Sequence, residues 1–166
     1  MDHVTHAIAP VFDRRSRALV LGTMPSPASR DAGFFYMHPR NRFWPVMAAV
    51  FGAETPEGVE ARRAFALEHR FALWDTIASC DIAGASDSSI ANVVPNDIAA
   101  LVAGTEIRAV FTTGATATRL YRRYQEQAVG LPLHPLPSSS PANCAVSREA
   151  LIEAYRAVRT AIESAK

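Results

Sequence analysis

The pattern of hydrophobic and polar residues divides the chain into four short apolar runs separated by amphipathic segments. The runs are only a few residues long, are rich in aliphatic and β-branched residues, and are bounded by Gly or Pro, which is typical of buried strands. The predicted strands are residues 18–21, 71–77, 107–114 and 131–137. Prolines remove backbone donors from the last run, so we expect that strand to be short or at a sheet edge.

The amphipathic segments between these runs predict helices, several of which have recognisable N-terminal caps. Thr55 is the predicted N-cap of one helix and Asn96 of another, which Gly104 would end; Ser147 is the predicted N-cap of the last helix. The predicted helices are residues 43–51, 56–70, 95–104, 115–127 and a final helix after residue 147.

Alternation of strands and helices predicts an α/β fold with a mostly parallel sheet that is covered on both faces. Ligands of such sheets bind beyond the carboxyl ends of the strands. Segments 22–42 and 137–143 follow the first and fourth predicted strands, so we expect both loops on the same rim. The sequence contains no internal repeat or linker, which predicts one domain over residues 1–166.

Composition excludes several classes of protein. The chain has 166 residues, of which 49% are hydrophobic and 20% charged, with a net charge of +1 and two cysteines. Its apolar runs fall short of the roughly 18 residues of a membrane span, and the start of the sequence lacks a secretory pattern. We therefore expect a cytoplasmic protein without a disulfide framework. The net charge gives no global electrostatic attraction to nucleic acid.

The sequence also lacks the residue patterns of several catalytic and cofactor sites. Lys166 is the only lysine, so a mechanism that needs an internal lysine nucleophile is disfavoured. The five histidines are scattered without metal-ligand spacing, and the glycine-rich nucleotide motifs are missing. We expect neither a metal nor another cofactor.

Three consecutive aromatic residues, Phe34, Phe35 and Tyr36, interrupt the loop that follows the first strand. Successive side chains of an extended segment point to opposite sides, so the three rings cannot all face one core. One of them is expected to face a cavity or solvent, where it could stack on a planar base for about 1–3 kcal/mol. The alternative is that all three pack beneath the loop as a separate cluster.

His38 and Asn41 are compact polar residues in the same loop. A carboxamide offers both an acceptor and a donor, so Asn41 could contact a base edge or orient a water molecule, although it cannot act as a general base. The alternative for His38 is a hydrogen bond to the loop backbone, and the alternative for Asn41 is an N-cap of the helix that follows.

Serine hydroxyls on both loops could contact phosphate groups. Ser26 lies on the first loop, and Ser138, Ser139 and Ser140 lie on the second. The alternative is that these serines only stabilise turns. His134 lies near the serine run, but the sequence has no GxSxG motif, so a serine hydrolase is disfavoured.

Two separated segments, "LGTMPSPASRDAGFFYMHPRNRFW" and "LPSSSPAN", resemble motifs one and two of the uracil-DNA glycosylase superfamily. Residues 71–90 resemble the middle segment of its hypoxanthine-DNA (deoxyinosine) glycosylase branch, family 6. The resemblance implies a three-layer α/β/α sandwich with a four-stranded parallel sheet. It also implies hydrolysis of the N-glycosidic bond of a deaminated base that is flipped out of DNA. A monomer that needs no cofactor and leaves an abasic site would fit this activity.

The resemblance carries roles onto individual residues of this chain. It implies that Asn41 is catalytic and that Tyr36 stacks on the flipped base. The other residues expected to bind the base are Gly22, Thr23, Met24, Phe35 and His38. Ser26, Ser138, Ser139 and Ser140 would contact the DNA backbone, and Asp75, Asp81 and Asp87 are reserve acids.

Three positions depart from the family pattern. Met24 occupies a position where many relatives carry Asp or Asn, Leu136 replaces the motif-two His of some relatives, and Ser140 falls at the position of an intercalating Leu. These departures leave open a uracil-preferring enzyme of the same superfamily and a non-catalytic DNA- or nucleotide-binding module. Lesion preference, strand preference and the opposite-base requirement also stay open.

Overall fold

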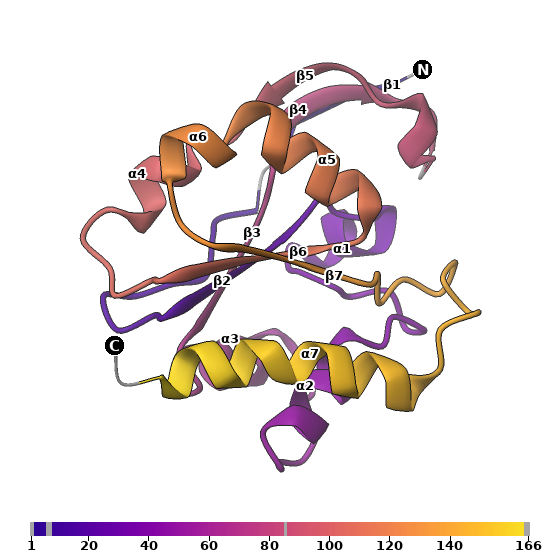
Figure 1. The fold of residues 1–166 in the computed structure, drawn as a ribbon. Coiled ribbons are helices and arrows are strands. Elements are labelled where there is room, and N and C mark those ends of the chain that lie inside the picture. Colours follow the sequence, from indigo (N-terminus) through magenta and orange to yellow (C-terminus); the bar gives the residue numbers. More distant parts are fainter. Residues whose placement is uncertain (1, 6–7, 85, 165–166) are drawn as a thin grey trace.

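Four parallel strands form the central sheet of the computed structural model, which describes residues 2–5, 8–84 and 86–164 (Figure 1). The strands lie in the order β3–β2–β6–β7. Their bounds are Ala18–Gly22 for β2, Phe71–Asp75 for β3, Ala109–Thr113 for β6 and Leu133–Leu136 for β7. The predicted four-stranded parallel sheet is confirmed, and the proline-containing strand β7 lies at its edge.

Helices cover both faces of this sheet and produce three layers (Figure 1). Residues of β2 alternate between the faces. Val20 packs into a core with α2 (Phe43–Val50) and α7 (Arg148–Glu163), whereas Leu19 and Leu21 pack into a core with α4 (Ile98–Val102) and α5 (Ala115–Tyr124). Every residue of β2 is buried, as expected for a central strand of a sheet covered on both sides. The predicted α/β/α sandwich is therefore confirmed.

The bounds of the helices are as follows. They are α1 (Pro27–Ala32), α2 (Phe43–Val50), α3 (Val59–Glu68), α4 (Ile98–Val102), α5 (Ala115–Tyr124), α6 (Glu126–Val129) and α7 (Arg148–Glu163). Ser147 caps α7 as predicted, since its side chain accepts a hydrogen bond from the Ala150 N–H. The short helix α1 inside the first loop was not predicted.

Three predictions about helix ends are wrong. Thr55 is not an N-cap, because Gly58 has a φ of +84° that an α-helix excludes and α3 begins only after it. Asp97, rather than Asn96, caps α4 through the Ala100 N–H. The helix predicted over residues 115–127 is broken at Gln125, whose side-chain amide donates to the Asn96 carbonyl.

A second, antiparallel sheet was also missed by the sequence analysis. It contains β1 (Asp2–Thr5), β4 (Ile77–Ile82) and β5 (Ala91–Pro95), in the order β1–β4–β5. The 3₁₀ helix η1 (Asp87–Ser89) lies between β4 and β5. The pairing of β4 with β5 shifts register twice, so no regular alternation marks these strands in the sequence.

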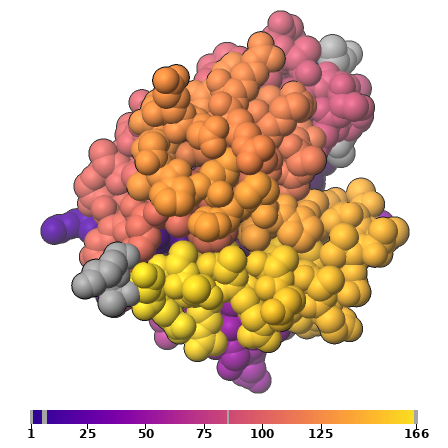
Figure 2. Space-filling view, viewed as in Figure 1, coloured from indigo at the N-terminus to yellow at the C-terminus, as the bar shows by residue number. Residues whose placement is uncertain are grey.

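The carboxyl ends of β2 and β7 lead into the two loops that the sequence analysis placed on one rim. Figure 1 shows both loops on the same side of the sheet, and Figure 2 shows the segment between β7 and α7 projecting there beyond the helices. This rim is where a ligand site of an open α/β sheet is expected. No helix within the described part of the chain is long and apolar enough to span a lipid bilayer.

Candidate active site

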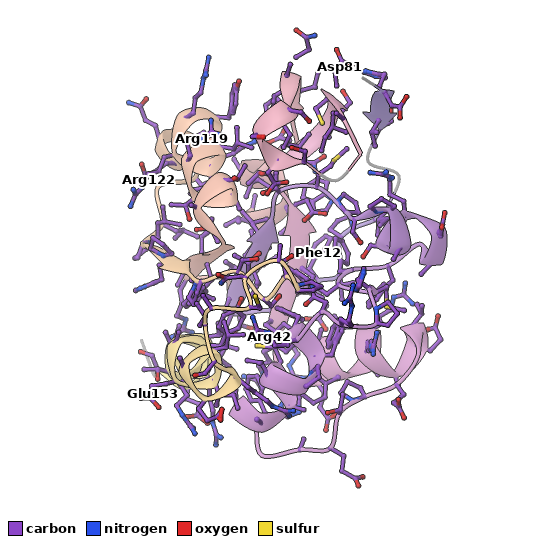
Figure 3. All side chains as sticks on the ribbon, turned by 90° about the vertical axis from the view of Figure 1, so that its right-hand side faces the viewer. Phe12, Arg42, Asp81, Arg119, Arg122 and Glu153 are labelled. Carbon is purple, nitrogen blue, oxygen red and sulfur yellow. The ribbon has the colours of Figure 1, made fainter. Side chains whose placement is uncertain are left out.

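A cavity of about 520 Å³ opens at this rim, a volume typical of small-ligand sites. Figure 3 looks onto this side of the molecule. All residues that the sequence analysis assigned to base binding or catalysis line the cavity: Gly22, Thr23, Met24, Phe35, Tyr36, His38 and Asn41. The predicted serines Ser26, Ser138, Ser139 and Ser140 line it as well. The two loops therefore do converge on one site.

The aromatic trio consists of two fully buried phenylalanine rings and one half-buried tyrosine ring. Phe34 and Phe35 are 0% and 2% exposed and belong to the main core, so the alternative of a separate cluster beneath the loop is wrong. Tyr36 has a φ of +55°, and after this left-handed turn its half-buried ring packs against the edge of the main core and lines the cavity. Such a conformation is strained for a tyrosine, by about 1–3 kcal/mol, and strain of this kind clusters at functional sites.

The Tyr36 ring is held in place on one side and at its tip. One face stacks on Phe43, with ring centroids 3.9 Å apart and planes within 12°. The hydroxyl lies 3.2 Å from Thr113 Oγ1, a residue of β6 that the sequence analysis did not assign to the site. Burial, together with the negative charge of Asp75, raises the pKa of the Tyr36 hydroxyl well above its ordinary value. The ring is thus a neutral, fixed part of the cavity wall.

Asn41 connects the first loop, the start of α2 and the loop between β7 and α7 that carries Ser138, Ser139 and Ser140, called the serine loop below. Its Oδ1 accepts one hydrogen bond from the Phe43 N–H at 2.9 Å and another from Ser139 Oγ at 2.9 Å. The first bond satisfies a free N–H at the start of α2, but the N-cap residue is Arg42, so the prediction of Asn41 as the N-cap is wrong by one position. Asn41 also lines the cavity, so the side chain that bonds to the start of α2 is in a position to meet a ligand.

His38 also combines a hydrogen bond to the loop backbone with a position at the cavity. Its Nδ1 accepts a hydrogen bond from the Arg40 N–H at 3.1 Å, which is the loop-backbone bond considered above. A neutral imidazole that accepts at Nδ1 carries its proton on Nε2. Because His38 lines the cavity, this ring can present an N–H donor to a ligand there.

The serines are more firmly tied to the protein than expected. Ser26 Oγ accepts from the Ser29 N–H, Ser138 Oγ from the Ser140 N–H and Ser140 Oγ from the Ala142 N–H. These bonds show that the three serines stabilise turns, and their contact with the DNA backbone stays a prediction. Ser139 is 2% exposed and donates to Asn41, so a contact between this hydroxyl and the DNA backbone does not fit its burial.

Arg42 fixes the serine loop against the start of α2, a function that the sequence did not reveal. Its backbone N–H donates to the Ser139 carbonyl, and its guanidinium donates to the carbonyls of Asn143 at 2.8 Å and Val146 at 2.5 Å. Figure 3 shows Arg42 beside this segment. The Tyr155 hydroxyl donates to the Pro137 carbonyl at 2.7 Å, and burial raises the pKa of this hydroxyl. Two elements therefore hold the loop from opposite ends.

The three reserve acids lie in different surroundings. Asp75, at the end of β3, is 4% exposed and lines the cavity. A Cβ added to Gly22 would lie 2.5 Å from Asp75 Oδ1, so only glycine leaves room for this carboxylate. Asp87 lines the cavity from η1, where loss of hydration raises the pKa of its carboxyl and Arg119 opposes this rise.

Asp81 does not belong to the site, and its proposed role as a reserve acid there is corrected. It lies on β4 in the antiparallel sheet, where it contacts His3 Nδ1 at 2.9 Å and accepts from Asn92 Nδ2 at 2.6 Å. These hydrogen bonds, from Asn92 first and then His3, lower the pKa of Asp81. Asp81 is not among the residues that line the cavity.

Two of the residues that depart from the family pattern, Met24 and Leu136, lie in different parts of the structure. Met24 lines the cavity and packs against the core cluster of the second sheet, whereas Leu136 is buried in the main core.

Within the described residues, no group of three or more His, Cys, Asp or Glu side chains could hold a metal ion. Lys166 and the N-terminal residue, the two possible sources of an amine nucleophile, lie outside the described residues.

Comparisons with known proteins find relatives of this chain. A family model described as the uracil DNA glycosylase superfamily matches residues 9–160. The chain is similar to a hypoxanthine DNA glycosylase of Methanosarcina acetivorans, with 28% identity over 80% of this chain and 84% of the relative. A hypoxanthine DNA glycosylase of Methanosarcina barkeri is 29% identical over 49% of this chain and 52% of its own length.

A solved structure is also similar over nearly the whole chain. It is the solution NMR structure of a Methanosarcina acetivorans protein described as a candidate uracil DNA glycosylase. The two structures superpose with a TM-score of 0.80 at 26% identity, and the match covers 93% of this chain and 96% of that one.

Proposed function

The chain belongs to the uracil DNA glycosylase superfamily, and from this premise we propose that it is a monofunctional DNA glycosylase of base excision repair that removes hypoxanthine from deoxyinosine in DNA. One observation carries the proposal: an aromatic ring and a carboxamide from the first loop and a buried carboxylate from the end of β3 line a single cavity at the carboxyl edge of the sheet. The naming of two relatives as hypoxanthine DNA glycosylases supports this choice of lesion.

A base can reach this cavity only after it leaves the DNA stack. Enzymes that act on a base in DNA rotate the nucleotide into a pocket, at a cost of a few kcal/mol. Stacking of the purine on the exposed part of the Tyr36 ring would return about 1–3 kcal/mol of this cost. Because Phe43 supports the opposite face, the ring cannot tilt away from the base.

The reaction breaks the bond between the sugar and the purine nitrogen and adds water to the sugar. The purine takes the bonding electrons and later a proton, while the sugar passes through an oxocarbenium-like state. A hydrogen bond to the purine stabilises the departing base, and a nearby carboxylate stabilises the sugar cation and accepts a proton from water. We assign this chemistry to Asn41 and Asp75, which both line the cavity.

The partner in this proposal is DNA that contains a deaminated base, bound by a cytoplasmic monomer over residues 1–166. The net charge of +1 gives little long-range attraction, so we expect modest affinity that falls as salt rises. No internal lysine is available for a covalent amine intermediate, so the product should be an abasic site in an uncut strand.

The test is release of hypoxanthine from a deoxyinosine oligonucleotide in the presence of a chelator. We expect Asn41→Ala to reduce the single-turnover rate by about 10²-fold or more, the scale of a lost transition-state hydrogen bond. A matched control is Asn92→Gly, which removes a carboxamide from the antiparallel sheet at a position with a φ of +53° that glycine adopts readily. Unchanged activity in Asn41→Ala would remove this residue from the reaction.

Two other functions have specific support and are separated by the substrate. Likeness to the candidate uracil DNA glycosylase favours a uracil-preferring enzyme as the second candidate. Met24 and Leu136, which replace polar residues of relatives, favour a non-catalytic binding module. A panel of hypoxanthine, uracil and xanthine oligonucleotides, each single- and double-stranded, distinguishes all three. Binding without release of any base would identify the non-catalytic module.

A further inference from the structure

We propose that Ser139 is a positioning residue that fixes the Asn41 carboxamide with its Nδ2 toward the cavity, so that Asn41 donates a hydrogen bond to the departing base and does not orient the attacking water. This inference rests on the proposed glycosylase function. It replaces the expected contact of Ser139 with the DNA backbone by a role inside the site.

The orientation of the carboxamide follows from the partners of its oxygen. The Phe43 N–H can only donate, so the Asn41 atom 2.9 Å away from it is the acceptor Oδ1 and not Nδ2. Ser139 Oγ is the second donor to the same oxygen, also at 2.9 Å. A carbonyl oxygen has two lone pairs, and both now have a partner.

The remaining polar group of Asn41 is its amide nitrogen, which carries two N–H donors. These N–H groups have no protein partner among the described residues, and Asn41 lines the cavity. A base that leaves with the bonding electrons gains negative charge, which a donor stabilises. A water nucleophile needs an acceptor, and the saturated Oδ1 cannot supply one, so in this cavity that role suits the Asp75 carboxylate.

Ser139 is well suited to hold the carboxamide, because its own position is fixed by other groups. The residue is 2% exposed, and its carbonyl accepts from the Arg42 N–H at 3.1 Å. The Arg42 guanidinium holds the following part of the loop through the carbonyls of Asn143 and Val146. Loss of the Ser139 hydroxyl also removes its hydrogen bond with the Tyr155 hydroxyl. Tyr155 keeps its bond to the Pro137 carbonyl, so the loop should stay in place while the carboxamide is released.

The first arm of the test is Asn41→Asp, measured with wild-type protein and Asn41→Ala on the deoxyinosine oligonucleotide. Aspartate keeps an oxygen for Phe43 and Ser139 but replaces the donor by a second acceptor. We expect a loss of about 10²-fold at neutral pH, close to that of Asn41→Ala. If Asn41 oriented water, the carboxylate would preserve or increase the rate, and that result would overturn the inference.

The second arm is Ser139→Ala, with Ser16→Ala as a matched control. Ser16 is also a fully buried serine with a hydrogen bond to its own turn, but it precedes β2 at the other end of the strand. We expect Ser139→Ala to lower the saturating single-turnover rate about tenfold, the scale of one hydrogen bond, while oligonucleotide affinity changes less than about twofold. Equal rates in Ser139→Ala and wild type would contradict the positioning role.

A third arm does not depend on catalysis and so separates failure of this inference from failure of the proposed function. The side-chain amide signals of Asn41 in an ¹⁵N NMR spectrum are identified by their loss in Asn41→Asp. They should shift or broaden in Ser139→Ala and stay unchanged in Ser16→Ala. Unmoved signals in Ser139→Ala would refute the inference. A wild-type protein that releases no base from any lesion would refute both the donor role and the proposed function.

Discussion

Asp75 and Asp81 belong to one short stretch, WDTIASCDI, yet they occupy opposite kinds of environment. Asp75 ends the parallel strand β3, is 4% exposed and lines the cavity. Asp81 lies on the antiparallel strand β4, away from the cavity lining, with His3 and Asn92 as partners. The two carboxylates show that nearby positions in the sequence can lie in a cavity at the rim and in a separate sheet.

The turn between the two strands explains the difference. Thr76 donates to the Gly22 carbonyl through both its backbone N–H at 2.9 Å and its hydroxyl at 3.2 Å. These bonds hold the end of β3 against the end of β2, and the chain then leaves the parallel sheet to form β4. A carboxylate before this turn is directed to the rim, whereas one after it lies on the second sheet. The local sequence alone does not distinguish these positions.

The largest expected effect that separates the two carboxylates comes from Asp75→Asn and Asp81→Asn. Proton acceptance by a positioned side chain contributes about 10²–10⁴-fold, so Asp75→Asn should reduce single-turnover hypoxanthine release by at least about 10²-fold. Asp81→Asn should leave the rate within about twofold. Equal losses in the two variants, or none in either, would contradict the division between them.

The fold was largely predictable because its four central strands are short apolar runs that glycine and proline interrupt. The antiparallel sheet was not predictable, since the bulges between β4 and β5 disturb the alternation that would identify strands. Within the site, the residues of the first loop were predicted by resemblance, and their convergence on a cavity is what the structure adds. Arg42, Thr113 and Ser139 act through contacts distant in sequence, for which a single sequence gives no signal.

A smaller effect is expected where the rim depends on the absence of a side chain. In Gly22→Ala the new Cβ would lie 2.5 Å from Asp75 Oδ1, so the carboxylate must move. We expect a loss of stability of about 1–3 kcal/mol, typical of an overpacked buried site, and a lower rate of base release. Denaturant unfolding and the single-turnover assay measure the two effects.

The clash between Gly22→Ala and Asp75 can be isolated by a double-mutant cycle. Asp75→Ala removes the carboxylate, so the destabilisation caused by Gly22→Ala should become smaller in that background. If the cost of Gly22→Ala were the same with and without the carboxylate, its origin would lie in the backbone of β2 and not in the room needed by Asp75.

The smallest expected effect is the pH dependence of stability that Asp81 gives to the antiparallel sheet. Hydrogen bonds from Asn92 and His3 lower the pKa of Asp81 in the folded protein, so the folded state binds this proton less readily than the unfolded chain. The stabilisation is therefore present above the unfolded pKa of about 3.9 and is lost as pH falls through the lower folded value. Thermal unfolding should show Asp81→Asn less stable than wild type at neutral pH, with the difference shrinking in acid. A difference that stayed constant down to the lowest pH would assign the loss to packing, because only the charged carboxylate titrates in this range.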